Sequence, residues 1–231
     1  MKQKILKVHQ DNPAYGHKRL AMELKIGKNR ALRIMHKYNI KPPRRKAKSF
    51  YTTRSVNNCS YTNLIINIIP SRPCQIYCSD LTYIKFHGQF VYLGTCQDIY
   101  TKQIMSAEIS TKHDQHLAYQ VVKESFKKGI PEIFHFDQGK ENMADKVTGY
   151  IEGKGVAISV SDKGSPWQNG YQESFFSRFK DENGDLNRFD SMGYLIEEIY
   201  SYIKYYNSKR IHTSLKTSPL KFKQAYVESV H

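Results

Sequence analysis

The chain has 231 residues and a formal net charge of +15, with 36 Lys or Arg against 21 Asp or Glu. The surplus is concentrated at the front, since residues 1–50 contain 15 Lys or Arg against Asp11 and Glu23, and this favours a polyanionic partner such as nucleic acid. No apolar run approaches the 18 or so residues that cross a bilayer, and the first residues lack the apolar stretch of a signal peptide. These features exclude a membrane-spanning or secreted class, and a cytoplasmic location is expected.

The four cysteines also favour a cytoplasmic location. A chain of this length can bury a core without disulfides, so free thiols in a reducing compartment are expected. Cys74 and Cys78 have no second ligand pair at zinc-like spacing, which argues against a zinc site. No Cys precedes Cys59, which argues against an N-terminal zinc finger. The four residues are Cys59, Cys74, Cys78 and Cys96.

Residues 1–40 read as a small helical module. Asn12-Pro13 ends any first helix, and two short amphipathic segments then flank a turn at Gly27, the second running from about Lys28 to Tyr38. The pattern alone fits a DNA-binding helix-turn-helix and an ordinary helical hairpin equally well. A helix-turn-helix would offer these basic side chains of its second helix to DNA: Lys28, Arg30, Arg33 and Lys37.

Residues 41–69 read as a basic linker. Pro42-Pro43 prevents a helix, and the Lys/Arg-rich residues that follow, Arg44 and Arg45 among them, have nothing apolar to bury. We expect this part to be extended and to follow a DNA backbone. The apolar residues 64–69 are expected to form a short buried piece.

Residues 70–185 predict a mixed α/β core. Three strand-like runs, 75–86, 89–99 and 103–110, are joined by short turns, which is typical of an antiparallel meander. Helix and strand patterns then alternate, which indicates a five-stranded mixed sheet flanked by helices. The alternating segments are a helix at 114–126, a strand at 133–136, a helix at 143–152, a strand at 156–160 and a helix around Glu173. Residues 186–231 are expected to form a closing helical segment.

Three carboxylates stand out within this core. Asp80 lies in the first strand, Asp137 directly follows the strand 133–136, and Glu173 lies near the start of a helix. Carboxylates that converge from two strands and a helix can hold two hard divalent cations, which serve phosphodiester chemistry. With 21 acidic residues, chance spacing is the competing interpretation, and Asp98 in the neighbouring strand is an alternative ligand.

The loop before Glu173 is rich in Gly and Pro, so it can approach a DNA backbone closely. Lys163, Gln168 and Asn169 would supply donors there, while Trp167 either stacks on a base or packs inside the protein. In the helix, Phe175, Phe176 and Phe179 form one apolar stripe that would fix the direction of Glu173. Lys180 lies two turns beyond Glu173 and could hold the DNA end.

Three blocks in this order resemble the catalytic blocks of retroviral-integrase-like DDE transposases. The blocks are YCSDLTYI at 77–84, HFDQG at 135–139 and GSPWQNGYQESF at 164–175. The resemblance is closest to the second reading frame of bacterial insertion-sequence family three, and it runs from about Pro13 to about Ala225. Phe136 departs from the family pattern, where a small hydroxyl residue is usual, and Asn142 departs from the usual aromatic residue.

The resemblance implies an RNase H-like fold in which Asp80, Asp137 and Glu173 are the catalytic and metal-binding residues. It implies two Mg²⁺ ions, for which Mn²⁺ can substitute, and DNA strand cleavage followed by strand transfer. It also implies that the chain acts on double-stranded DNA at element ends and target, at the bacterial nucleoid, as a homo-oligomer with a possible partner reading-frame product.

Two further segments resemble family blocks. Residues 15–19 resemble the opening of the helix-turn-helix-like segment, which shifts the front module toward DNA binding and adds Lys18 and Arg19 as contacts. Residues 205–219 resemble the closing block, in which Arg210 is a further DNA contact and His212 belongs to the scaffold.

Two rival functions stay open from the sequence. The first is a catalytically impaired DNA-binding remnant that competes for element ends, suggested by the two departures beside Asp137. The second is a ribonuclease H-type hydrolase, against which the basic front module and the long closing block argue.

Overall fold

The structure is a computed structural model that describes residues 1–43 and 60–230, so the predicted DNA contacts Arg44 and Arg45 lie outside the described residues. The chain divides into two compact units. The sheet unit comprises Ser49–Ser177 and Asp185–Ile203. The terminal unit comprises Met1–Lys48, Arg178–Gly184 and Lys204–His231.

This division differs from the segments expected from the sequence. The predicted closing segment 186–231 is shared between the two units, with the change after Ile203 inside one continuous helix. Likewise, the helix that carries Glu173 changes unit after Ser177. Long helices that serve two cores show no break in periodicity, so their sequence gives no boundary.

The sheet unit is built on the predicted five-stranded mixed sheet, in the order β3-β2-β1-β4-β5. The first three strands form an antiparallel meander, and β4 and β5 extend it in parallel. The sequence prediction of the sheet is therefore confirmed. The strands are β1 (Ile76–Phe86), β2 (Gln89–Asp98), β3 (Ile104–Ser110), β4 (Ile133–Phe136) and β5 (Ala157–Val160).

The turn between β1 and β2 has the chemistry of a tight hairpin. His87 and Gly88 both have positive φ, 44° and 85°, which matches the right-handed twist of the strands that they join. His87 N donates to Asn187 Oδ1 at 2.8 Å, and the His87 Nε2 atom lies 2.8 Å from Phe189 O. These contacts tie the hairpin to the residues that follow the helix carrying Glu173.

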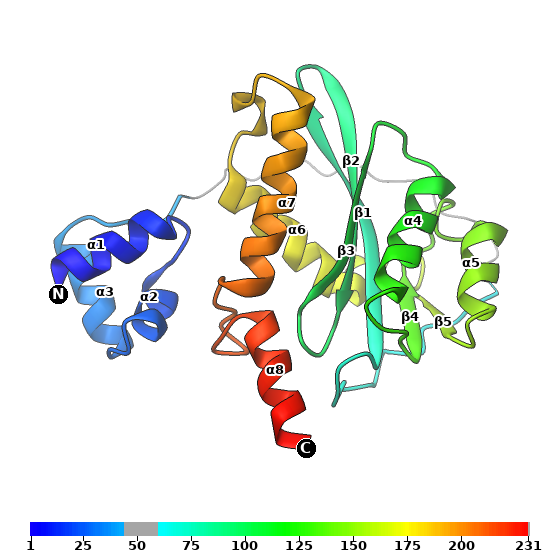
Figure 1. Ribbon diagram of the computed structural model, residues 1–231, viewed down its shortest axis with the longest axis horizontal. Helices are drawn as coiled ribbons and strands as arrows, with labels where there is room; N and C mark the ends of the chain where they lie inside the picture. Colours follow the sequence, from blue (N-terminus) through cyan, green and yellow to red (C-terminus); the bar gives the residue numbers. More distant parts are fainter. Residues whose placement is uncertain (44–59, 231) are drawn as a thin grey trace. The chain divides into compact units, whose positions relative to one another are not determined.

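Helices α4 (Gln115–Phe126) and α5 (Asp145–Glu152) cover one face of the sheet (Figure 1). Asp114 caps α4, because its Oδ1 accepts from the backbone N–H groups of residues 116 and 117 at 3.1 Å. The packing is close at Gly94 on β2, where a Cβ would lie 2.6 Å from the Val121 side chain. A larger residue there would require the side chains of Val121 and Leu81 to shift.

The terminal unit contains three short helices at the front of the chain, α1 (Lys2–Asp11), α2 (His17–Glu23) and α3 (Lys28–Lys37). The first helix ends before Asn12, and the next two flank Gly27, as the sequence predicted. Their apolar faces share a core with a residue from the far end of the chain. This core consists of Ile5, Tyr15, Leu20, Met35, Ile40 and Ile211.

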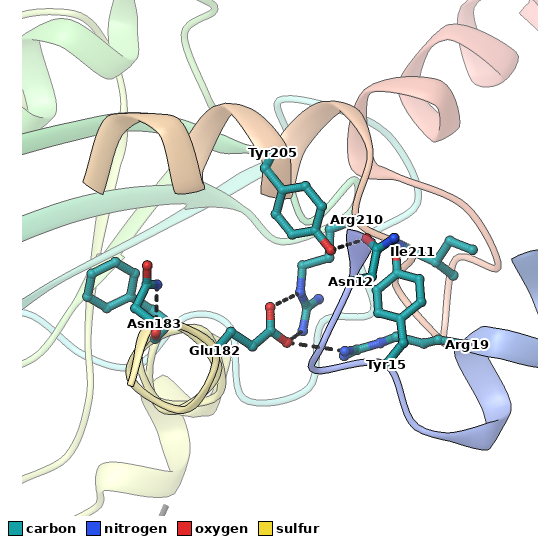
Figure 2. A network of polar contacts seen from close by, with 9 residues as sticks. Asn12, Tyr15, Arg19, Glu182, Asn183, Tyr205, Arg210 and Ile211 are labelled. Carbon is teal, nitrogen blue, oxygen red and sulfur yellow. Dashed lines mark hydrogen bonds and ion pairs between the residues drawn. The ribbon is translucent and has the colours of Figure 1, made fainter. Parts of the chain in front are cut away.

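A buried polar network joins the same segments of the terminal unit, as Figure 2 shows. Glu182 accepts two bonds from Arg210, at 2.7 and 2.5 Å, and one from Arg19 at 3.1 Å. Tyr205 Oη donates to Asn12 Oδ1 at 2.6 Å, and the Ile211 N–H donates to Tyr15 Oη at 2.7 Å. The front helices are therefore held by residues more than 160 positions away in sequence.

Two expectations from the sequence are wrong, one about Arg210 and one about residues 64–69. Arg210, expected to contact DNA, is only 1% exposed, and its guanidinium is engaged by Glu182, so it stabilises the fold instead. The apolar segment 64–69 is not a buried piece, because Ile66 is 62% and Ile69 is 91% exposed. Apolar composition indicated burial there, but the segment belongs to no regular helix or strand that would place it in the core.

Within the described part of the chain, no helix is both long enough and apolar enough to cross a membrane. Cys74, Cys78 and Cys96 are free thiols.

Candidate active site

The parallel pairing of β1 with β4, in the middle of the sheet, places Asp80 and Asp137 beside the carboxyl end of β4. The last paired residues of the two strands are Cys78 and His135. Asp80 lies two residues further along β1, and Asp137 lies two residues further along the chain, directly after β4 ends. Because side chains alternate with a period of two, both carboxylates share the face of the pair from which they are counted. Neighbouring strands lie roughly 4.8 Å apart, so these two residues are near neighbours.

The start of α6 (Gly170–Asn183) is fastened to the same face. Cys78 Sγ donates to Asn169 Oδ1 at 2.7 Å, and Asn169 Nδ2 donates to Ser79 O at 3.2 Å. One turn on, Gln172 Nε2 donates to Cys78 O, and Gln172 Oε1 accepts from Thr95 Oγ1 at 2.8 Å. Thr95 is the partner of Asp80 across β1 and β2. Glu173, the residue after Gln172, therefore enters beside the strand position of Asp80.

Asp137 is held by its own loop. Its Oδ1 accepts from Gly139 N at 3.0 Å and from Asn142 Nδ2 at 2.8 Å. Asn142 is thus a site residue that the sequence marked only as a departure from the family pattern. Phe136, the other departure, is fully buried among the side chains beneath α4 and α5 and belongs to the opposite face of β4.

The three carboxylates are not gathered into a finished ligand cluster. Among residues 1–43 and 60–230, no three His, Cys, Asp or Glu side chains lie close enough together to hold a metal ion. Partial burial raises the pKa of Glu173 above its usual value by desolvation. As donors, the three residues offer only carboxylate oxygens, which fit Mg²⁺ or Mn²⁺ and not Zn²⁺.

The other acidic residues near the site have structural partners. Asp98 is 1% exposed and accepts from the backbone N–H groups of Cys74 at 2.9 Å, Tyr100 at 2.8 Å and Thr101 at 3.2 Å. It shapes the end of β2, which argues against the alternative of Asp98 as a ligand. Glu141 pairs with His113 Nδ1 at 3.1 Å.

The loop before α6 departs in part from its expected role. Asn169 is 4% exposed and bonded to β1, so it positions the helix and does not offer its amide to DNA, which corrects the expectation. Gln168 closes the loop on itself, donating to Asp162 Oδ2 at 2.7 Å. Lys163 is exposed at the loop. The side chain of Trp167 lies outside the described ones, so its two interpretations both stay open.

The remaining predicted contacts fall into two groups. Arg19 is drawn into the ion pair with Glu182, and Lys180 is half-buried. Phe175, Phe176 and Phe179 are buried, as the apolar stripe predicted. Among the predicted DNA contacts of the terminal unit, those with exposed side chains are Lys18, Lys28, Arg30, Arg33 and Lys37.

Lys102 is a second residue of this region that sequence reasoning missed. It lies in the turn after β2, and its Nζ stands 4.0 Å from the centre of the Tyr171 ring at the start of α6. Burial lowers the pKa of Lys102 to about 8, against the smaller opposing effect of Asp98. A single Lys in a turn carries no sequence signal of this burial.

Replacing Lys102 by Met should stabilise the protein near neutral pH. In the unfolded chain Lys102 keeps its usual pKa near 10.5, so between pH 8 and 10.5 the unfolded state binds more protons. The free-energy cost of burying the charged Lys102 is therefore absent above pH 10.5, grows as the pH falls, and is complete below pH 8. We expect Lys102→Met to gain about 1–3 kcal/mol at pH 7 and almost nothing at pH 10.5 in urea unfolding. Lys128→Met, at an exposed Lys, is the control, and its effect on stability should not change with pH. A gain for Lys102→Met that does not change with pH would contradict this account.

The sequence is similar to integrase cores and to transposases of bacterial insertion sequences. Family profiles described as "Integrase core domain" match residues 70–166 and residues 154–219. The chain is 25% identical to the putative transposase InsK for insertion sequence element IS150 of Escherichia coli, covering all of this chain and 85% of the relative. It is 27% identical to the transposase for insertion sequence element IS904 of Lactococcus lactis, covering 79% of this chain and 74% of the relative.

Solved structures agree on the fold. The HTLV-2 integrase catalytic core domain, whose structure was solved in complex with magnesium, superposes with a TM-score of 0.55 at 14% identity. The match covers 66% of this chain and 97% of that domain. The sheet unit accordingly has the RNase H-like fold of integrase cores, in which a mixed five-stranded sheet is flanked by helices.

Proposed function

We propose that this chain, which belongs to the integrase-core transposases of bacterial insertion sequences, uses Asp80, Asp137 and Glu173 to cut DNA at element ends and to join them to a target. One observation carries the assignment of these residues. The register of β1 and β4 places two carboxylates on one face, and the bonds of Asn169 and Gln172 bring the helix of the third to that face.

Two Mg²⁺ ions held by these three residues would activate the attacking oxygen and neutralise charge on the phosphodiester. The chain itself supplies position. Asn142 and the Gly139 N–H fix one oxygen of Asp137, which leaves the other oxygen for a cation. Gln172 and Asn169 hold the first turn of α6, so Glu173 is delivered on a rigid element and not on a loop.

Water is the first nucleophile and breaks one P–O bond, which leaves a 3′ hydroxyl on the element end. That hydroxyl then attacks a phosphodiester of the target and expels a second 3′ oxygen, so the number of phosphodiester bonds is conserved in the joining step. These two reaction steps require no oxidant and no covalent intermediate with the protein.

The DNA partner is supported by charge. The exposed cations of α3, with Lys18 and Lys163, would contact double-stranded element ends and target through phosphates. We further propose that the chain acts as a homo-oligomer on DNA, with a partner reading-frame product, in the bacterial cytoplasm at the nucleoid. The two sequence departures that suggested an impaired remnant both have a place in the fold, Asn142 on Asp137 and Phe136 in the core.

A strand-transfer assay tests the function. The purified chain, with its partner-frame product, is given a radiolabelled pre-cleaved element end and supercoiled plasmid in Mg²⁺. We expect labelled joined products, and from an uncleaved end we expect nicking first. Binding of the end without nicking or joining in either Mg²⁺ or Mn²⁺ would identify a DNA-binding remnant and reject the proposal.

Both reactions should require a hard divalent cation. EDTA should stop nicking and joining, and added Mg²⁺ or Mn²⁺ should restore them, while Zn²⁺ should not, because the three carboxylates provide only oxygen ligands. A shift in thermal unfolding with Mn²⁺, lost in Asp80→Asn, gives a readout independent of activity. Full activity in EDTA would contradict the metal assignment.

A further inference from the structure

A short stretch of chain ahead of β1, residues 61–65, lies along the outer edge of β5, the last strand of the sheet. We call it the edge segment. The Val160 N–H donates to Thr62 O at 3.1 Å, and the Leu64 N–H donates to Ser159 Oγ at 2.9 Å. These bonds fix the backbone of the edge segment to the sheet, although the segment is itself neither a helix nor a strand.

Asn63 joins the edge segment to the loop before α6. Its Nδ2 donates to Gln168 Oε1 at 2.9 Å, and its Oδ1 accepts from the Ile65 N–H at 3.0 Å. Gln168 Oε1 also accepts from the Asp162 N–H at 2.6 Å. A backbone N–H can only donate, so the N–H groups of Ile65 and Asp162 fix the orientation of both side-chain amides. The bond from Asn63 to Gln168 therefore has one direction, with Asn63 as the donor.

Gln168 is the residue on which the loop, residues 162–168, closes. Its Nε2 donates to Asp162 Oδ2 at 2.7 Å, and its backbone N–H donates to Ser165 O at 3.0 Å. The next residue, Asn169, is bonded to β1. The edge segment thus holds the closing point of the loop from the side of β5, and Asn169 holds it from the side of β1.

This double attachment gives the loop its shape before any ligand binds. Asn63 and Gln168 are both half-buried, so water competes less for the bond between them. The loop carries Lys163, a proposed contact of the DNA backbone, and it leads into the helix of Glu173. A loop that is already shaped loses less conformational entropy when it binds, and its ligand binds more tightly for that reason.

We propose that Asn63 is a positioning residue of the active site, which acts through Gln168 to hold the loop 162–168 in the shape that receives DNA. The inference rests on the proposed function, in that DNA is the ligand of this loop. Without the bond, binding of the DNA end should weaken. The rate of joining at saturating DNA should be nearly unchanged, because Asn142 still holds Asp137 and Gln172 still holds the start of α6.

Asn63→Asp is the sharpest variant, because it removes only the donor. Its Oδ1 can still accept from the Ile65 N–H, whereas its second oxygen faces Gln168 Oε1. The concentration of pre-cleaved end that gives half-maximal joining should rise about 3- to 10-fold, as expected for one hydrogen bond. The rate at saturation should change by less than about twofold. Asn63→Ala, which adds no charge, should move the half-maximal concentration in the same direction.

Asn67→Asp is the matched control for the added negative charge, because Asn67 is an exposed asparagine two residues after the edge segment. It should leave the half-maximal concentration within about twofold. In a Gln168→Ala background, Asn63→Asp should have no further effect, since the partner of Asn63 is already gone. Asn67→Asp acting as strongly as Asn63→Asp, or two effects that simply add, would overturn the proposal.

The loop can also be observed without DNA, because Trp167 is the single tryptophan of the chain and lies within it. Time-resolved fluorescence anisotropy of the free protein should show a larger amplitude of nanosecond motion in Asn63→Asp and Asn63→Ala than in the unmodified chain or Asn67→Asp. Equal amplitudes in all four proteins would overturn the proposal. So would a lower rate at saturation with an unchanged half-maximal concentration, because a merely structural role of Asn63 reduces the active fraction and leaves the affinity alone.

Failure of this assignment is distinguishable from failure of the proposed function, since the motion of Trp167 and the dissociation constant of labelled end DNA need no reaction. If the unmodified chain joins element ends and Asn63→Asp behaves like Asn67→Asp, the transposase assignment stands and the role of Asn63 falls. If the chain joins nothing but Asn63→Asp loosens the loop and weakens DNA binding, the role of Asn63 stands and the proposed function falls.

Discussion

Replacing Glu173 by Gln is expected to abolish both nicking and strand transfer while DNA binding and folding stay nearly intact. The substitution keeps the volume of the side chain and removes the charge that the two proposed cations would require. Glu173 enters on α6 from a direction different from the strands of Asp80 and Asp137, as a site that surrounds both cations needs. Its side chain is exposed, so no core packing is lost. Nicking of an uncleaved end and joining of a pre-cleaved end measure the two steps.

Glu141→Gln is the matched control, because Glu141 is the other glutamate near Asp137 and pairs with His113. It should keep activity within about tenfold, as expected for a group outside the direct ligands. Equal activity of Glu173→Gln and the unmodified chain would show that Glu173 is not a ligand. Loss of DNA binding or of circular dichroism in Glu173→Gln would instead attribute its effect to folding.

Replacing Glu182 by Gln should destabilise the terminal unit by roughly 3–5 kcal/mol, because it leaves two neighbouring arginines without their carboxylate. Arg210 is almost fully buried, so water cannot take the place of the lost partner. Residues 1–43 should then become sensitive to protease at concentrations that leave the unmodified chain intact. Denaturant unfolding followed with a probe on α1 measures the free energy.

Glu198→Gln is the control for that variant, since Glu198 pairs with Arg188 at the surface and such pairs contribute at most about 1 kcal/mol. The triple replacement Arg19→Met/Glu182→Leu/Arg210→Met removes all three charges together and should recover much of the stability. A loss below 1 kcal/mol for Glu182→Gln, or a triple variant less stable than the single one, would contradict the account of this network.

Local patterns in the sequence predicted the sheet and most helices well. Short-range signals are enough to locate β1, β2 and β3, because each strand is bounded by turn residues such as His87-Gly88, whose chemistry is local. The alternation of strands and helices after these three strands indicated the mixed character of the sheet, whereas the order of its strands came only from the structure. Asp80, Asp137 and Glu173 could be singled out for the same reason, as each lies next to a recognisable element.

The partners of charged side chains could not be predicted in this way. Arg210 was expected to contact DNA because it lies in the segment that resembles the closing block of the family, whereas its partner Glu182 lies 28 residues earlier and meets it only in the folded chain. Asn169 likewise looked like a surface donor until β1 was placed beside it. Asn142 stands five residues after Asp137, and an amide at that distance forms a bond only when the loop folds back.

Anomalous diffraction from crystals of the protein bound to a pre-cleaved DNA end in Mn²⁺ tests the central claim most directly. We predict two Mn²⁺ peaks about 3.5–4 Å apart, bounded by the carboxylates of Asp80, Asp137 and Glu173, with the scissile phosphate beside them. Peaks coordinated by Asp98 or Glu141 in place of any of the three, or a DNA end positioned away from them, would contradict it.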